Sequence, residues 1–473
     1  DPRPRARRPR ALFRGVWRHG PQRRPQHGHH HPHHGGAAGG RGGLACAGAG
    51  GGGAGGRFGA RLRIPGNPQQ GPRHAQSPGL PGMSAVTPTA PPLLLKGFEV
   101  ELYTGRPDGT VVGCSAEAAA ALSGFVTEPD CRNLEYITPP DARYGQQLEL
   151  LLEPRRRLRP WLAERGLTLL PGSTLSTGDS HRFDRSDPGN PYHGYIEATY
   201  GTRVVTASVH INLGLTDMDA LFAGCRLMRC EGALLLALSA SSPFLDGQST
   251  GAHSQRWLQF PLTPPEVPLF ESHGHYIAWM EQQLQLGTMQ NVRHLWTSVR
   301  PNGDDRPHDL NRLEIRICDL ITDPLLLLAV TAFAELRLHQ LLADPQRHDP
   351  LRASRLDAAA LAQLADANDR AAARSSLEAP LRHWRSGESI TARAWLARAL
   401  QEMAPLAREY GLEGWLAPLH AVLEHGNQAM QWLEAHRGGT AVAPLIAAGA
   451  AAMAQQEAQL NADLATERFG PLG

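Results

Sequence analysis

The 473-residue sequence contains a single lysine, Lys96, among its 47 basic residues. It also lacks a GxxxxGKS or GxxxxGKT phosphate-binding loop, which excludes the nucleotide site of the common ATPases. The planar guanidinium of arginine can make two parallel contacts to a phosphate or carboxylate. Any phosphate contacts in this protein are therefore expected to come mainly from arginines, unlike those of P-loop ATPases and protein kinases.

The six cysteines include no CxxC pair and no histidine partner at zinc spacing. This pattern favours a reduced, cytoplasmic protein with structural thiols over a zinc-binding or disulfide-rich one. No stretch reaches 18 consecutive apolar residues, so no membrane span is predicted. The apolar run at Gly232–Ala240 is too short to cross a bilayer and predicts a buried helix.

Acidic residues are almost absent from the first 82 positions, which hold 14 arginines against the single acid Asp1, a net charge of +13. The remaining 391 residues carry 33 basic and 44 acidic side chains, a net charge of −11. Residues 1–82 are rich in glycine and histidine and lack a periodic apolar pattern, so we expect them to be disordered. The near-neutral total hides this division and gives no support for a nucleic-acid partner.

The first methionine is Met83, which lies just ahead of the first strand-like run. We interpret Met83 as the natural start and residues 1–82 as upstream or appended sequence. Two alternatives are a transition-metal site in the histidine-rich run 27–34 and an arginine-rich transit peptide.

From Pro92 to about Asp323 the chain alternates strand-like runs with loops and helical stretches, whereas from Pro324 onward it is rich in alanine and leucine at helical spacing. We therefore expect an α+β fold, with a catalytic domain over residues 83–350 and a helical C-terminal region over residues 351–473 packed on it.

Local signals predict several of the helices. Thr216 and Asp217 are expected to cap a helix that runs to about Ser239, and Pro264 and Pro265 to open another. Three helices are predicted in the C-terminal region, at Leu356–Ala373, Ile390–Tyr410 and Ala441–Leu464.

Four strand-like runs place unusual polar residues on one face when the two-residue strand period is applied. The runs are Gly97–Tyr103, Asn133–Thr138, Arg203–Leu213 and Asn311–Asp319. Each has an apolar face, as in Phe98, Val100 and Leu102 of the first run. The opposite faces carry Glu99, Glu101, Glu135, His210, Asn212, Glu314 and Arg316.

Carboxylates gathered on one face of a sheet raise each other's pKa values unless cations lie among them. Oxygen ligands with one imidazole suit Mg²⁺, or Mn²⁺, better than zinc. For any single glutamate, the alternative is an ion pair with a surface arginine, and a strand histidine can be a hydrogen-bonded core residue. The joint pattern favours a metal site, and divalent ions held this way are what phosphoryl transfer from ATP requires.

Several motifs occur in the order typical of one enzyme family. They are GFEVEL (97–102), NLEYITPP (133–140), VHINLGL (209–215), ALSASSPFLDGQSTGAHSQRW (237–257) and NRLEIRICDL (311–320). This set resembles the glutamate–cysteine ligase family. The motifs PGSTLS (171–176), RSDPGNPYH (185–193) and ESHGHYIAW (271–279) make it most similar to the cyanobacterial type, and the resemblance extends over about Leu93–Pro350.

The resemblance implies a glutamine-synthetase-like fold, in which a curved antiparallel sheet forms a funnel for two or three Mg²⁺ ions. It implies an ATP-dependent ligase that activates the γ-carboxylate of L-glutamate as γ-glutamyl phosphate. The amine of L-cysteine would then displace phosphate to give γ-glutamylcysteine, in the first step of glutathione biosynthesis. Alternatives are a ligase of the same fold with another amine acceptor, a guanidino phosphotransferase, and a catalytically silent metal-binding relative.

The resemblance also assigns roles to individual residues. Arg316 would lie against the phosphates, and Arg256, expected in a loop, would bind a substrate carboxylate. Its alternative is a surface arginine without such a role. Asn212 would orient substrate or satisfy the sheet. The metal ligands would be Glu99, Glu101, Glu135, His210 and Glu314.

Overall fold

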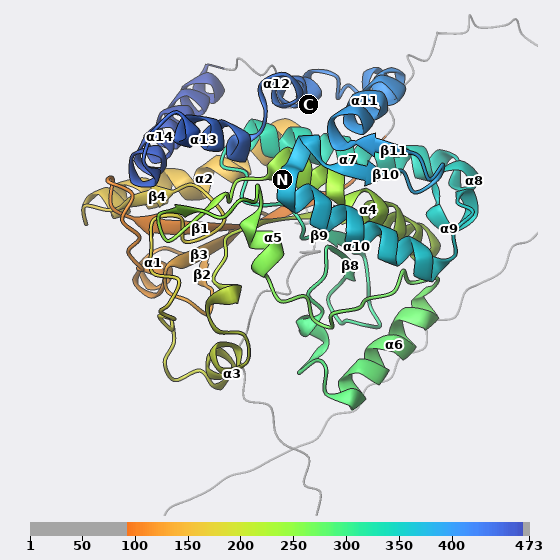
Figure 1. The fold of residues 1–473 in the computed structure, drawn as a ribbon, viewed down its shortest axis with the longest axis horizontal. Helices are drawn as coiled ribbons and strands as arrows, with labels where there is room; N and C mark the ends of the chain where they lie inside the picture. Colours follow the sequence, from red (N-terminus) through yellow and green to blue (C-terminus); the bar gives the residue numbers. More distant parts are fainter. Residues whose placement is uncertain (1–91, 467–473) are drawn as a thin grey trace, which may run out of the picture. The chain divides into compact units, whose positions relative to one another are not determined.

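A seven-stranded antiparallel sheet lies at the centre of the computed structural model, which describes residues 92–466 (Figure 1). Six strands follow one another in the order β2, β3, β1, β5, β9, β8, and β4 pairs with β1 beside this path. The strands are β1 (Lys96–Gly105), β2 (Phe125–Thr127), β3 (Asn133–Ile137), β4 (Thr168–Leu170), β5 (Val209–Gly214), β8 (Val299–Asn302) and β9 (Arg312–Ile315). The four strand-like runs of the sequence thus become four consecutive neighbours, β3, β1, β5 and β9.

The strand register brings the predicted polar residues opposite one another. Glu101 of β1 pairs with Glu135 of β3. Glu99 of β1 pairs with His210 of β5. Asn212 of β5 pairs with Glu314 of β9. Directly paired residues project from the same face of a sheet, so one face gathers the polar side chains.

Two of the expected strands are shorter than predicted. The run Arg203–Leu213 begins as a 3-10 helix, Gly201–Val204, and pairs continuously only from Val209. The run Asn311–Asp319 ends as a continuous strand at Ile315. The carbonyls of Arg316 and Ile317 accept hydrogen bonds from the Arg256 side chain instead of a neighbouring strand.

The apolar face of the sheet packs on α4 (Met218–Ser239), a helix that is buried over most of its length. A Cβ atom at Gly224 of α4 would come within 3.1 Å of Leu313 and Leu338, so glycine allows the helix to approach β9 and α7 (Pro324–Ala343) closely. Asp217 caps α4 by accepting the backbone N–H of Ala220 at 2.8 Å, which confirms the predicted start and end of this helix.

The helix expected after Pro264 and Pro265 starts later. Helix α6 spans His273–Leu286 and is capped by Ser272. The preceding segment stays non-helical because its carbonyls accept hydrogen bonds from two arginines of α4: Arg229 binds the carbonyl of Val267, and Arg226 binds that of Phe270.

The C-terminal region contains the three predicted helices, now bounded as α10 (Ala358–Ser375), α11 (Ala392–Glu409) and α14 (Val442–Ala465). Helix α10 packs along α4. A two-stranded hairpin, β10 (Pro380–Arg382) and β11 (Ser389–Thr391), interrupts the helices, which the helical spacing did not predict. In Figure 1, α11 to α14 gather at the top of the view and α3 and α6 at the bottom.

The remaining elements connect these layers. They are α1 (Ser115–Ala121), α2 (Tyr144–Ala163), α3 (Pro191–Tyr200), β6 (Phe244–Leu245), β7 (Gln248–Ser249), α5 (Gln255–Gln259), α8 (Pro345–His348), α9 (Pro350–Ala353), α12 (Ala417–His425), α13 (Gln428–Arg437) and short 3-10 turns.

One described helix, α7, is long and apolar enough to cross a membrane by length and composition. The most apolar stretch of α7 is 78% buried inside the fold, and a core helix passes the same test. The predictions for residues 1–82 and for a start at Met83 concern positions outside the described residues.

Candidate active site

Three side chains from three adjacent strands meet on the polar face of the sheet. Glu99, His210 and Glu314 offer ligand atoms that all lie within 4.8 Å of one another. The Nδ1 atom of His210 lies 2.9 Å from Glu99 Oε2 and 3.7 Å from Glu314 Oε1. Two carboxylates and one imidazole suit Mg²⁺ or Mn²⁺, so the chemistry of this donor set fits the predicted ion.

Glu101 lies beside this triad. Its Oε2 atom accepts the backbone N–H of Ser208 at 2.7 Å and the Ser208 hydroxyl at 2.8 Å. Its other oxygen, Oε1, lies 3.8 Å from His210 Nε2. Ser208 thereby fixes one carboxylate oxygen, and the other points along the row of predicted ligands.

Glu135 is paired with Glu128, a residue that is not among the predicted ligands. Burial and the charge of Glu101 raise the pKa of Glu128 to about 8. Burial and the charge of Glu128 raise the pKa of Glu135 well above its ordinary value. A bound cation would offset the repulsion between these two carboxylates and favour their ionised forms. This second pair therefore also fits a divalent ion.

Glu314 is completely buried and held by three donors. Arg300 donates to both carboxylate oxygens, at 2.7 and 3.0 Å, and Asn302 donates at 2.7 Å. Arg316 donates to Oε1 as well. Burial alone would raise the pKa of Glu314, but Arg300 and Arg316 hold it well below its ordinary value. Glu314 is therefore a carboxylate of this face that stays ionised without a metal.

Arg300 and Asn302 come from β8, a strand that is not among the four predicted runs. Burial and the nearby Arg316 lower the pKa of Arg300 to about 9. The two-residue period within Val299–Asn302 places Arg300 and Asn302 on one face, a signal that could have identified them. The strand has only four residues and contains Pro301, which hid the pattern.

Arg256 lies neither in the loop nor at the surface position that its sequence context suggests. It belongs to the short helix α5, and its side chain is 3% exposed. Its Nη1 and Nη2 atoms donate to the carbonyls of Ile317 and Arg316 at 3.1 and 2.9 Å. Arg256 thus supports the chain that carries Arg316, and binding of a substrate carboxylate remains a prediction.

Asn212 connects two charged residues of the face. Its Nδ2 atom donates to Glu99 Oε1 at 3.2 Å, and its Oδ1 atom accepts from Arg312 Nε at 3.3 Å. These contacts fix the orientation of the Glu99 carboxylate, so Asn212 satisfies groups of the sheet. Orientation of substrate by Asn212 stays a prediction.

Five cysteines lie in the described part of the chain, and all are free thiols. Cys318, two residues beyond Arg316, is fully buried, and burial raises the pKa of its thiol to about 12. Such a thiol is not a nucleophile, which agrees with its interpretation as a small buried residue.

The sequence model of glutamate–cysteine ligase family 2 matches residues 95–457, which is more than half of the chain. The chain belongs to this family. The match confirms the resemblance inferred from the motifs and includes every residue of the candidate active site. The members of this family are ligases of the glutamate–cysteine ligase type.

Two relatives each carry the name "putative glutamate–cysteine ligase 2". The relative from Sorangium cellulosum is 26% identical over 285 residues, covering 59% of this chain and 72% of its own. The relative from the cyanobacterium Gloeobacter violaceus is 26% identical over 278 residues, covering 58% of this chain and 71% of its own.

Two solved structures share the fold. One is a glutamate–cysteine ligase of Francisella tularensis in complex with AMP, with a TM-score of 0.59 and 13% identity over 80% of this chain and 94% of that chain. The other is a bifunctional glutathione synthetase of Pasteurella multocida, with a TM-score of 0.59 and 17% identity over 80% of this chain. The present chain spans 53% of that longer protein. Both structural similarities support the expected arrangement of helices on an antiparallel sheet.

Proposed function

We propose that this protein is an ATP-dependent ligase that joins the γ-carboxylate of L-glutamate to the amine of L-cysteine. The products would be γ-glutamylcysteine, ADP and phosphate, with γ-glutamyl phosphate as the intermediate. The observation that supports this proposal most directly is the triad of Glu99, His210 and Glu314 on adjacent strands, with Arg300 and Arg316 beside it. Membership of the family supports the choice of reaction.

Glu99, His210 and Glu314 would hold one Mg²⁺ or Mn²⁺ ion, and Glu101, Glu128 and Glu135 a second. When bound, such ions would offset the negative charge that develops during phosphoryl transfer. We also propose that the antiparallel sheet forms the metal-binding funnel of a glutamine-synthetase-like fold.

The arginines would align the two anions that must react. The side chain of Arg316 is 13% exposed and that of Arg300 is 7% exposed, so Arg316 is the more accessible to a phosphate. A guanidinium held by Glu314 has its remaining N–H groups oriented before substrate binds. Alignment of the reactants and neutralisation of their charge provide most of the rate acceleration in such a reaction. The protein therefore needs little acid–base chemistry for the phosphoryl step.

The test is phosphate release with Mg²⁺ and ATP, measured with glutamate and with cysteine, 2-aminobutyrate, other amines or no amine. We expect release that requires both glutamate and cysteine. Glu314→Ala should lower it by at least about a hundredfold, since it removes a metal ligand and the partner of two arginines. Glu409→Ala, an exposed glutamate of α11, is the matched control and should be unchanged.

Release that follows another amine would retain the ligase but replace the acceptor. Release that is equal with and without glutamate would contradict the proposal.

A further inference from the structure

One end of the polar face carries arginines from β8, from β9 and from the chain that adjoins these strands. They are Arg300, Arg306, Arg312 and Arg316. Arg300 and Arg316 donate to Glu314, and Arg312 donates to Asn212. The guanidinium of Arg306, in contrast, makes no hydrogen bond or ion pair with any residue between 92 and 466. Arg306 thus has no protein partner of its own in the part of the chain that the structure describes.

Arg306 lies in the loop that connects β8 to β9, and this loop is anchored at two points. A Cβ atom at Gly303 would overlap the carbonyl oxygen of Asp309, so glycine lets the two sides of the loop approach each other closely. His273 of α6 donates through Nε2 to the carbonyl of Pro307 at 2.8 Å. The backbone that carries Arg306 is therefore fixed by contacts that do not involve its side chain.

The Arg306 side chain is half-buried and lies near the charged groups of the polar face. Its charge is one of those that hold the pKa of Glu314 well below the ordinary value, after the charges of Arg300 and Arg316. Burial lowers the pKa of Arg306 itself, and the charge of Glu314 opposes this shift. The guanidinium is thus close enough to Glu314 to act on its charge, but it does not form an ion pair with it.

A half-buried guanidinium without a partner is unfavourable, because burial removes water from the charge and no carboxylate takes its place. Glu314 does not meet this need, since both of its oxygens already accept hydrogen bonds from Arg300 and Arg316. The planar fork of an arginine can bind a carboxylate or a phosphate through two parallel hydrogen bonds. A bound oxyanion would therefore provide the acceptors that Arg306 lacks.

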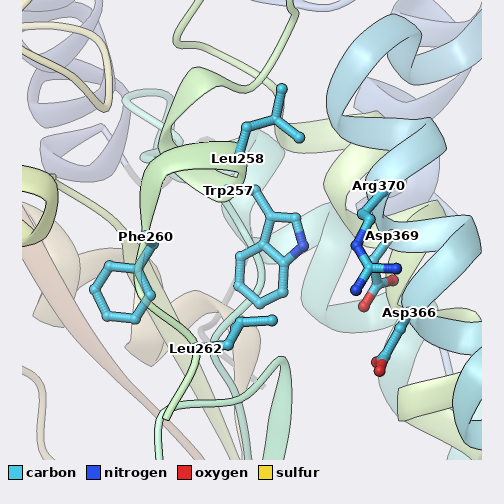
Figure 2. Close-up of a pocket in the computed structure, with 7 residues that line it drawn as sticks. All are labelled: Trp257, Leu258, Phe260, Leu262, Asp366, Asp369 and Arg370. Atoms are coloured by element: carbon cyan, nitrogen blue, oxygen red, sulfur yellow. The ribbon is translucent and has the colours of Figure 1, made fainter. Parts of the chain in front are cut away.

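Figure 2 shows a cavity of about 160 Å³ between α5 and α10, and Arg306 is not among the residues that line it. Its walls include Trp257 of α5 and Asp369 of α10. Arg256, the neighbour of Trp257 in α5, contacts instead the carbonyl of Arg316 beside the polar face. Helix α5 therefore lies between this cavity and the polar face, so an anion held by Arg306 belongs to the polar face.

We propose that Arg306 is a further substrate-binding residue, whose guanidinium binds a carboxylate or phosphate group of one substrate. This role rests on the proposed ligase function, in which ATP, L-glutamate and L-cysteine each bring such a group to the polar face. Arg306 differs from Arg300 and Arg316 in having no carboxylate that already holds it. It contacts the substrate directly and takes no part in proton transfer.

The test is isothermal titration calorimetry of the full chain with Mg²⁺ and with ATP, L-glutamate or L-cysteine alone, which measures binding without turnover. Arg306→Ala should weaken binding of one of the three by at least about tenfold and change the other two by less than about twofold, as loss of one charged contact does. Arg306→Lys keeps the charge without the fork and should give an intermediate loss. Weaker ATP binding identifies a phosphate, and weaker binding of either amino acid identifies a carboxylate.

Two control variants separate this contact from a change in the loop and from a general effect of charge. His308→Ala alters an exposed residue of the same loop, Arg374→Ala removes an exposed arginine of α10, and both should leave all three affinities unchanged. In urea denaturation without ligand, Arg306→Ala should not lower the midpoint, because it removes an unpaired charge, whereas loss of a structural ion pair would lower it.

The proposal is overturned if Arg306→Ala binds all three substrates as tightly as the parent chain, or if it loses affinity equally for all three. It is also overturned if the parent chain binds none of them, or if the ligand-free variant has a lower urea midpoint. Phosphate release that does not require glutamate would contradict the ligase reaction but leave these binding results unchanged, so the two failures are distinguishable.

Discussion

Lys96, the single lysine of the chain, is fully buried in an ion pair with Glu335 of α7, at 3.2 Å. Burial lowers the pKa of Lys96, whereas the charge of Glu335 opposes this shift. Glu335 also accepts a hydrogen bond from Tyr144 at 2.6 Å. This lysine therefore joins the first strand to α7 and α2, and its ammonium group is not exposed to solvent.

Lys96→Met is expected to lower the free energy of unfolding by about 3 kcal/mol at pH 7, because it leaves the Glu335 carboxylate buried without its cation. Urea denaturation followed by circular dichroism measures the change. The double variant Lys96→Met with Glu335→Leu should recover part of the loss, since it removes both charges. A loss below about 1 kcal/mol in the single variant would show that the pair is dispensable.

The pKa of Glu128 predicts how stability changes with pH when no divalent ion is present. Its folded value of about 8 lies above the ordinary value of 4.5, so the folded state favours the protonated carboxyl. This stabilising contribution is complete below 4.5, is lost progressively as the pH rises from 4.5 to 8, and changes little above 8. With EDTA, the free energy of unfolding should therefore fall by about 1 kcal/mol between about pH 7 and 8.

Glu128→Gln should reduce that pH dependence, because the glutamine does not titrate. Added Mg²⁺ should reduce it as well, since a bound cation favours the ionised carboxylates. Thermal unfolding at several pH values, with EDTA or Mg²⁺, checks both effects. An identical pH profile for Glu128→Gln and the parent chain would contradict the assignment.

Among the helices and strands, α4 packs against the apolar face of the sheet and binds its other neighbours through charged side chains. Arg226 pairs with Asp349 at 2.6 Å, and Arg229 pairs with Asp366. Glu231 accepts hydrogen bonds from Arg337 of α7 and from the Trp384 indole. Charged residues in the middle of an apolar helix thus specify which segments pack on it.

The first turn of α4 depends on Asp217. Asp217→Ala should lower the free energy of unfolding by about 1 kcal/mol, because the N–H of Ala220 loses its acceptor. Asp217→Asn is the control and should retain most of the stability, since asparagine caps equally well. Equal losses in the two variants, measured by urea denaturation, would assign the effect to charge rather than to capping.

For the molecule as a whole, all site residues lie downstream of Lys96, and the family match begins at residue 95. A chain that starts at Met83 should therefore release phosphate at a rate within about twofold of the 473-residue chain. It should also change its behaviour on ion exchange, because removal of residues 1–82 takes away a net charge of +13. A large loss of activity in the shorter chain would show that residues 1–82 contribute to catalysis.

Local spacing along the chain was sufficient to predict the polar face of the sheet. Side chains alternate along a strand whatever surrounds it, so the strand period placed Glu99, His210 and Glu314 on matching faces. The apolar residues between them required a buried opposite face, and this favoured neighbouring strands. The helices α4, α10, α11 and α14 followed from local caps and helical spacing in the same way.

The charges that face one another across the sheet depend instead on tertiary packing. Glu314 stays ionised because Arg300 contacts it from β8, and Glu128 resists ionisation because it is partly buried and lies near Glu101. Alternation along one strand carries no information about such partners. The cavity between Trp257 and Asp369 likewise depends on α5 and α10, which are distant in sequence, because packing and electrostatics act through space rather than along the chain.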